Sequence, residues 1–198
     1  LTTLEGTSSI HFSGEYVVVN GLVFQNGEGE RHVIEFKTGN GVYANHSTLS
    51  ECVIKDYNPA DKTVQTTWVS LWGKDSQENH HLITHNYFGY RPPLGSNGGE
   101  TMRIGTSHVS LSNSQTRVVE NYFEHCSGEV EIISVKSCEN EIVGNTFYEC
   151  EGSVVLRHGN RNVVDGNVFI GNDKKNTGGV RVVNEGHRIS GNVFYKLA

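Results

Sequence analysis

The phrase Asn121-Tyr122-Phe123 returns along the chain as an Asn-x-Phe repeat, and this repeat decides the fold. Its copies are Asn86-Tyr87-Phe88, Asn121-Tyr122-Phe123, Asn145-Thr146-Phe147, Asn167-Val168-Phe169 and Asn192-Val193-Phe194. The last four copies begin 24, 22 and 25 residues apart, whereas the first gap is 35 residues. That longer gap predicts an insertion in one unit, which includes Arg91-Pro92-Pro93-Leu94-Gly95.

A repeat of this length, with short strand-like runs and no helical periodicity, predicts an all-β solenoid, the parallel β-helix. We expect residues 1–198 to form a single such domain. Coils stacked about 4.8 Å apart would align Val, Ile and Phe in internal ladders. The recurring Asn suits a bend between sheets, because Asn tolerates a left-handed backbone and its amide can bond the next Asn in the stack. The alternative is an antiparallel sandwich with accidental repeats.

Composition narrows the class of protein. The formal net charge of −6 argues mildly against a nucleic-acid partner, so an anionic ligand would need a local basic cluster. No hydrophobic run approaches membrane-spanning length and no signal peptide is recognisable. The chain does not begin with Met, and we expect it to be a portion of a longer catalytic domain.

The four cysteines contain no CxxC pair, which argues against a zinc or thioredoxin-type site. Cys126 and Cys150 each lie five residues after the Asn of their repeat, so they are expected to stack in neighbouring coils. A disulfide between them is geometrically possible, and a pair of free, buried thiols is the alternative.

Strand alternation predicts which polar side chains face outward. In the run 129–133 we expect Val130 and Ile132 to point inward and Glu129 and Glu131 to point outward. A shift of 24 residues per coil then places Arg157 and Arg181 at equivalent positions in the next two coils. The predicted outer face, with the residues just beyond its strand ends and in the preceding loop, gathers Asn97, Glu100, Arg103, Glu129, Glu131, Lys136, Arg157, His158 and Arg181. The alternative is that these charges only keep an exposed sheet soluble.

Such a patch could perform β-elimination on a uronate polymer. Glu129 and Glu131 with a nearby amide oxygen form an oxygen-rich set that suits Ca²⁺ better than zinc. A cation bound to the substrate carboxylate would stabilise the anion that forms when the C5 proton leaves. Lys136 is the candidate base if it is neutral, and Arg157 is the candidate group at the departing O4 oxygen.

Three segments resemble polysaccharide lyase family 6, which contains alginate lyases and the dermatan-cleaving chondroitinase B type. They are Asn97-Gly98-Gly99-Glu100-Thr101-Met102-Arg103-Ile104-Gly105, Glu129-Val130-Glu131-Ile132-Ile133-Ser134-Val135-Lys136-Ser137 and Leu156-Arg157-His158-Gly159-Asn160. The resemblance implies a right-handed parallel β-helix in which Asn97, Glu129 and Glu131 hold Ca²⁺. It further implies that Lys136 is the Brønsted base, that Arg157 is the Brønsted acid, and that His158 and Arg181 bind substrate. To these we add Arg103 and Glu100 as substrate-binding residues, from their place on the predicted outer face.

The resemblance implies an anionic polysaccharide as substrate, and the segment Tyr90-Arg91-Pro92-Pro93 looks more like the alginate lyases than the dermatan enzyme. Cleavage would give 4,5-unsaturated oligosaccharides, and the site of action would be secreted or periplasmic. The alternatives are a dermatan or chondroitin lyase, another β-helix enzyme such as a pectate lyase or polygalacturonase, and a non-catalytic carbohydrate-binding solenoid. A hydrolase would need a close pair of carboxylates for acid–base work, whereas here basic residues accompany the outward Glu side chains.

Overall fold

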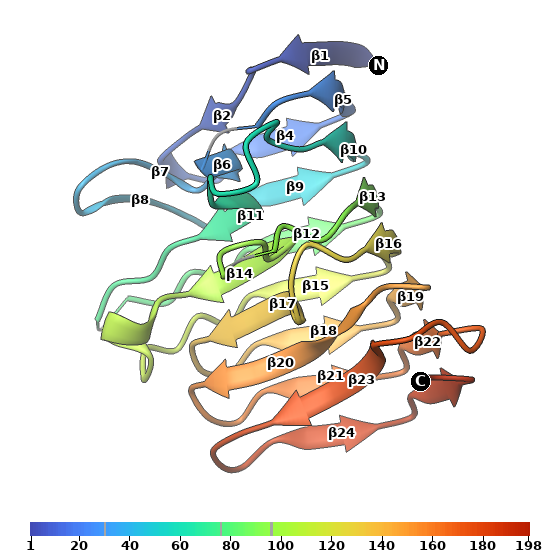
Figure 1. Ribbon diagram of the computed structural model, residues 1–198. Helices are drawn as coiled ribbons and strands as arrows, with labels where there is room; N and C mark the ends of the chain where they lie inside the picture. Colours follow the sequence, from blue (N-terminus) through green and yellow to red (C-terminus); the bar gives the residue numbers. More distant parts are fainter. Residues whose placement is uncertain (30, 76, 96) are drawn as a thin grey trace.

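The computed structural model describes residues 1–29, 31–75, 77–95 and 97–198, and it is a parallel β-helix with three long sheets (Figure 1). The first sheet has eight strands: β1 (Thr2–Gly6), β5 (Leu22–Gly27), β10 (Val53–Tyr57), β13 (Tyr87–Arg91), β16 (Tyr122–Cys126), β19 (Thr146–Tyr148), β22 (Val168–Ile170) and β25 (Val193–Tyr195). The second has seven: β2 (Ile10–His11), β6 (Arg31–Glu35), β11 (Thr66–Leu71), β14 (Met102–Gly105), β17 (Glu131–Lys136), β20 (Gly152–His158) and β23 (Thr177–Val182).

The third sheet also has seven strands: β4 (Val18–Asn20), β9 (Thr48–Ser50), β12 (Leu82–Thr84), β15 (Arg117–Val119), β18 (Glu141–Val143), β21 (Val163–Asp165) and β24 (Arg188–Ser190). A small sheet joins β3 (Gly14–Glu15), β7 (Lys37–Gly39) and β8 (Val42–Asn45), and a 3₁₀ turn η1 spans Ser107–Val109. Neighbouring strands of the long sheets pair in parallel, for example β16 with β19. The predicted fold class is therefore confirmed. No helix in the described residues is long and apolar enough to cross a membrane.

The Asn-x-Phe repeat forms two ladders that run from the coil of β13 to the coil of β25. Phe88, Phe123, Phe147, Phe169 and Phe194 stack with ring centroids 4.6–5.1 Å apart. Beside them, the amide of each repeat Asn donates to the side-chain oxygen of the next Asn at 2.9–3.0 Å. The predicted ladder of amides is thus confirmed, because an Asn buried at a bend can satisfy its polar atoms only through its neighbours in adjacent coils.

The backbone conformation at this bend differs from the prediction. The left-handed residue is the one before each Asn, such as His85, Glu120 or Gly144, and not the Asn itself. The Asn instead uses its amide to hold three coils together. Asn145 donates to the carbonyl of Val118 at 2.9 Å in the preceding coil and to Asn167 in the following one.

The cysteines are free and buried. Cys126 and Cys150 lie in neighbouring coils, as their spacing predicts, and the Cys126 amide donates to the Cys150 sulfur at 3.3 Å. The free-thiol alternative therefore holds in this structure, and burial raises the pKa of the Cys150 thiol. A thiol kept protonated in this way acts as a small apolar side chain.

Candidate active site

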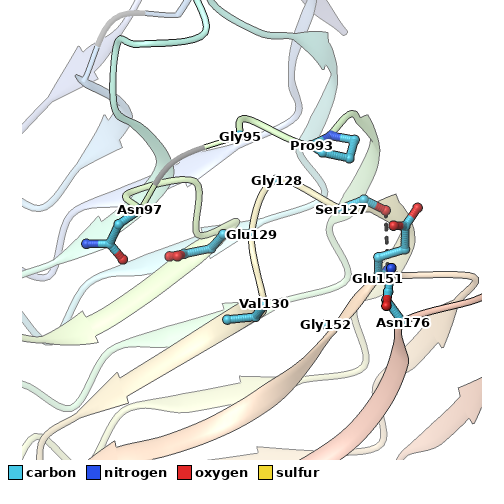
Figure 2. Close-up of a pocket in the computed structure, with 10 residues that line it drawn as sticks. All are labelled: Pro93, Gly95, Asn97, Ser127, Gly128, Glu129, Val130, Glu151, Gly152 and Asn176. Atoms are coloured by element: carbon cyan, nitrogen blue, oxygen red, sulfur yellow. Dashed lines mark hydrogen bonds between the residues drawn. The ribbon is translucent and has the colours of Figure 1, made fainter. Parts of the chain in front are cut away.

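Seven of the nine predicted site residues come together where the loop before β14 and the turn before β17 meet the second sheet. Two hollows adjoin there. One, of about 570 Å³, is lined by Arg31, His32, Val64, Gln65, Thr67, Trp72, Asn97, Gly98, Glu100, Arg103 and Lys136. The other, of about 560 Å³, is lined by Pro93, Gly95, Asn97, Ser127, Gly128, Glu129, Val130, Glu151, Gly152 and Asn176 (Figure 2). Asn97 lines both, so it stands at their junction.

Three carboxylates, those of Glu100, Glu129 and Glu131, influence one another in this region. Burial raises the pKa of Glu129 to about 7, and the negative charges of Glu100 and Glu131 add to the effect. The Oε1 atom of Glu129 is buried without a hydrogen-bond partner. Figure 2 shows this carboxylate and the Asn97 amide pointing toward one another. Glu129 therefore occupies a place where a positive charge would be strongly favoured.

Each of the other two carboxylates already has a cationic partner. Arg157 Nη1 lies 2.9 Å from Glu131 Oε1, and the Ser134 hydroxyl donates to the other oxygen of Glu131. Lys136 Nζ lies 3.5 Å from Glu100 Oε1, and Thr67 donates to Glu100 Oε2 at 3.3 Å. Burial acts to raise the pKa of Glu100, but a backbone hydrogen bond, Lys136 and Arg103 outweigh it and lower the pKa.

Arg103 extends this site toward the N-terminal coils. Its guanidinium carbon lies 4.8 Å from the centre of the Trp72 ring. Burial lowers the pKa of Arg103, while the negative charges of Glu100 and Glu35 oppose that shift. Its Nε and Nη2 atoms are buried and have no hydrogen-bond partner. These donors suit an anionic group that enters the hollow, because a buried guanidinium is costly until its N–H groups are paired.

The strand register at the site differs from the prediction. Residues 129–130 belong to the turn before β17, and Val130, expected inside, is 68% exposed. Glu131 pairs with Ser153, and the register shifts between Glu131 and Ile133 and again between Val135 and Lys136. The uniform 24-residue shift was therefore wrong: paired residues of β17 and β20 lie 21 or 22 positions apart, whereas those of β20 and β23 lie 25 or 26 positions apart, because the coils differ in length.

The revised register changes which basic residues are neighbours. Arg103 pairs with Ser134, and Arg181 pairs with Val155, so the expected equivalence of Arg157 and Arg181 is also wrong. Arg157 still reaches Glu131. Lys136 and His158 are the last residues of β17 and β20 and pair with each other, whereas they were expected just beyond the strand ends.

Two predicted substrate-binding residues lie outside the two hollows. His158 lines a separate hollow of about 530 Å³ together with Ser110, Leu111, Gly159, Asn160, Asn184 and Glu185. Arg181 is exposed on β23. The structure therefore gathers Asn97, Glu100, Arg103, Glu129, Glu131, Lys136 and Arg157, and leaves His158 and Arg181 at the margin.

The structure adds residues that the sequence analysis did not select. Trp72 donates to Glu35 at 2.9 Å, and its ring lies between Arg103 and Lys37, whose Nζ is 3.9 Å from the ring centre. Glu35 also contacts His11 at 2.9 Å. The available signal was the alternation in β6 and β11, which places Glu35 and Ser70 on the same outer face as Arg103.

The chemistry of the donors fits a hard cation, although the present arrangement is not a closed metal site. Within the residues that the structure describes, no three His, Cys, Asp or Glu side chains converge as ligands of one metal ion. The unpartnered Glu129 oxygen, the facing Asn97 amide and the neighbouring Glu131 nevertheless offer the oxygen ligands that Ca²⁺ prefers.

Comparison with known proteins identifies the family. The sequence profile described as chondroitinase B matches residues 2–77 and 71–198. The chain belongs to the chondroitinase B family, polysaccharide lyase family 6. Its members in this comparison are carbon–oxygen lyases that act on polysaccharides. A comparison with curated proteins gave no match.

Solved structures of family 6 lyases superpose on nearly the whole chain. A mannuronic acid specific family 6 lyase from human gut microbiota is 36% identical, with a TM-score of 0.82, and the match covers 96% of this chain and 49% of that one. The alginate lyase AlyGC is 44% identical, with a TM-score of 0.83, and the match covers 97% of this chain and 30% of that one. A family 6 alginate lyase in complex with a trisaccharide is 29% identical, with a TM-score of 0.79 and coverage of 98% and 47%. The chain thus spans about a third to a half of the length of these lyases.

Proposed function

We propose that this chain carries the catalytic face of a polysaccharide lyase that cleaves alginate by β-elimination. The observation that carries the proposal is the pair of contacts Lys136–Glu100 and Arg157–Glu131 beside the half-buried Glu129. They place a candidate base and a candidate acid on adjacent strands, next to an acidic cluster. A surface kept charged only for solubility has no reason to bury carboxylates in this way.

Lys136 is the proposed base. It takes the C5 proton as the neutral amine, so its contact with Glu100 opens to let the nitrogen face C5 before the proton moves. Arg157 is the proposed group at the leaving O4 oxygen, and its release from Glu131 frees the guanidinium to face the polymer. Arg103, with its unpaired buried donors, binds a uronate carboxylate, and Glu100 accepts from a sugar hydroxyl. His158 and Arg181 are proposed to contact sugar units farther from the bond that breaks.

Ca²⁺ is the proposed cofactor, held by Asn97, Glu129 and Glu131. When bound, it neutralises the substrate carboxylate and so makes the C5 proton easier to remove. The support in this chain is the unpartnered Glu129 oxygen and the repulsion among neighbouring carboxylates, which a divalent cation relieves. Glu131 can serve as a ligand only when it turns from Arg157, so cation binding and release of the proposed acid are linked.

Alginate is preferred as substrate because the similar structures include enzymes named as alginate lyases and a mannuronic acid specific lyase. Dermatan sulfate is the second candidate, since the matching family profile is that of chondroitinase B. Both polymers carry the uronate that the chemistry requires, and a secreted or periplasmic site of action follows from their size.

The test is incubation of the purified chain with alginate, its mannuronate and guluronate block fractions, and dermatan sulfate. Ultraviolet absorbance of the new C4–C5 double bond reports elimination. We expect absorbance to rise with alginate fractions and to stay flat with dermatan sulfate. New reducing ends without this absorbance would indicate a hydrolase, and tight binding without any product would indicate a non-catalytic module.

A further inference from the structure

Arg91 is a charged residue buried in the solenoid next to the turn that carries Glu129. It ends β13, pairs with Cys126 of β16, and is only 3% exposed. Its guanidinium carbon lies 4.9 Å from the centre of the Trp68 ring, and Nη2 donates to the carbonyl of Thr66. Nη1 is buried without a partner. An apolar side chain would fill this space without the free-energy cost of desolvating a guanidinium, so we expect the charge to have a function.

The turn that carries Glu129 rests on this side chain. A methyl group added at Gly128 would lie 2.3 Å from Arg91 Nε and 2.2 Å from the carbonyl oxygen of Gly99. The Ser127 amide donates to the carbonyl of Arg91 at 2.8 Å. The turn at Gly128 is therefore packed closely against Arg91 on one side and against Gly99, in the loop before β14, on the other.

The loop that carries Asn97 is joined to the same turn. The Leu94 amide donates to the carbonyl of Gly128 at 2.8 Å. A methyl group at Gly99 would lie 2.7 Å from the carbonyl oxygen of Gly128, so the two backbones are in close contact. The segment that carries Asn97 and the turn that carries Glu129 are thus in contact at Gly128. Gly128 in turn contacts Arg91.

We infer that Arg91 is a positioning residue, which fixes the Gly128 turn so that Glu129 faces Asn97 and the cation-binding oxygens keep their arrangement. The inference rests on the proposed function, because it concerns the proposed cation site. Burial lowers the pKa of Arg91 to about 10, and the negative charges of Glu100 and Glu129 oppose that shift, so the guanidinium is charged at neutral pH. Arg91 lies beneath the turn and acts without touching the polymer.

The experiment compares Arg91→Met, Arg91→Lys and a control, Ile142→Ala, in the full chain. Met approximates the length of Arg without its charge, and Lys keeps the charge but loses the planar contacts with Trp68 and Thr66. Ile142 is fully buried on β18 of the third sheet, so the control loses core packing away from the site. The measurements are the Tm, the Kd of Ca²⁺ alone by calorimetry, and kcat and KM on alginate.

We expect Arg91→Met to weaken Ca²⁺ binding by roughly 10- to 100-fold, the usual range for a residue that orients metal ligands. We expect kcat to fall by a similar factor while KM changes less than about threefold, and Arg91→Lys to lie between Arg91→Met and the wild type. Ile142→Ala should lower Tm without changing the Ca²⁺ affinity or kcat of the folded protein. Arg91→Met that lowers Tm but keeps the wild-type Ca²⁺ affinity and kcat would overturn the inference.

A fallback variant and one further measurement keep the outcome decisive. Where Arg91→Met does not fold, Arg91→Lys decides alone: weakened Ca²⁺ binding supports the inference, and unchanged binding overturns it. A wild-type chain that forms no unsaturated product refutes the proposed function instead. Amide hydrogen exchange at residues 127–129 then still tests the positioning role, since faster exchange in Arg91→Lys than in Ile142→Ala supports it and equal exchange removes it.

Discussion

Replacing Glu129 with Gln should stabilise the metal-free protein progressively as the pH rises from 4.5 to about 7, and by a constant amount above that pH. The pKa of Glu129 rises from its usual value of 4.5 to about 7, because burial and the charges of Glu100 and Glu131 disfavour the carboxylate. An acid whose pKa is raised on folding stabilises the fold while it is protonated in the folded state, which holds fully below pH 4.5. That contribution declines as the pH rises toward 7 and is lost above it, where the buried carboxylate is charged.

The magnitude follows from the size of the shift. Each tenfold change in proton affinity is worth about 1.4 kcal/mol, so a rise from 4.5 to about 7 would amount to ~3 kcal/mol for a fully enclosed carboxylate. Glu129 is only half-buried, and water screens part of the repulsion, so we expect ~1.5 kcal/mol. The free energy of unfolding of Glu129→Gln minus that of the wild type should therefore increase by ~1.5 kcal/mol between pH 5 and pH 8.

The assay is urea unfolding of both proteins in chelator, followed by circular dichroism across this pH range. Glu149→Gln is a suitable control. Glu149 follows β19 of the first sheet, and its pKa is lowered, chiefly by a hydrogen bond from Asn172, so it does not titrate between pH 5 and pH 8. A constant difference between Glu129→Gln and the wild type over the whole range would refute the reasoning. Added Ca²⁺ should stabilise the wild type more than Glu129→Gln, since the substitution removes a charged ligand.

Three other substitutions and one treatment test the site and the fold. Lys136→Ala and Arg157→Ala should each lower kcat by at least about 100-fold, in the range for loss of a proton-transfer group. Each substitution also leaves the buried carboxylate of Glu100 or Glu131 without its cationic partner, so Tm should fall while the fold is retained; near-normal turnover in either variant would remove its assigned role. Prolonged chelation should abolish formation of the C4–C5 double bond, and Ca²⁺ should restore it; full activity in chelator, with the protein shown to be metal-free by elemental analysis, would contradict the cofactor assignment. Asn145→Ala should destabilise the fold by ~2–4 kcal/mol, since it leaves buried amide and carbonyl groups in the two neighbouring coils unpaired; an effect no larger than that of the exposed Asn40→Ala, measured by the same unfolding assay, would argue against the ladder.

The fold could be predicted from the sequence because the solenoid repeats one local solution. Phe147 packs on Phe123 and Phe169, and Asn145 bonds Asn121 and Asn167, so the same residue types recur wherever the same bend recurs. Each coil has its own copy of the signal, and agreement among the copies makes the prediction robust. The left-handed residue beside each Asn was missed because Glu, His and Gly all occupy it.

The site was harder to predict for the same physical reason. The segment around Glu129 departs from the repeat: it forms a turn where the pattern counts a strand, and irregular pairing follows at Glu131 and before Lys136. A departure has no second copy to confirm it, so its register could be fixed only by packing between coils. Arg91 shows the limit most clearly, because nothing in the Arg91-Pro92-Pro93 insertion indicates that its first side chain turns into the core.

These departures from the repeat have a chemical consequence. A regular solenoid face presents each outward residue at a fixed spacing, and like charges stacked in this way repel one another. The turn at Gly128 breaks that spacing and brings Glu129 toward Asn97, while the irregular pairing before Lys136 lets Arg157 reach Glu131. Carboxylates and cations from three coils can then meet in one small volume, each partly paired before any ligand arrives. The regular ladders of Phe and Asn supply the stability that this half-satisfied cluster lacks, which is why the repeat predicts the fold and its interruptions mark the site.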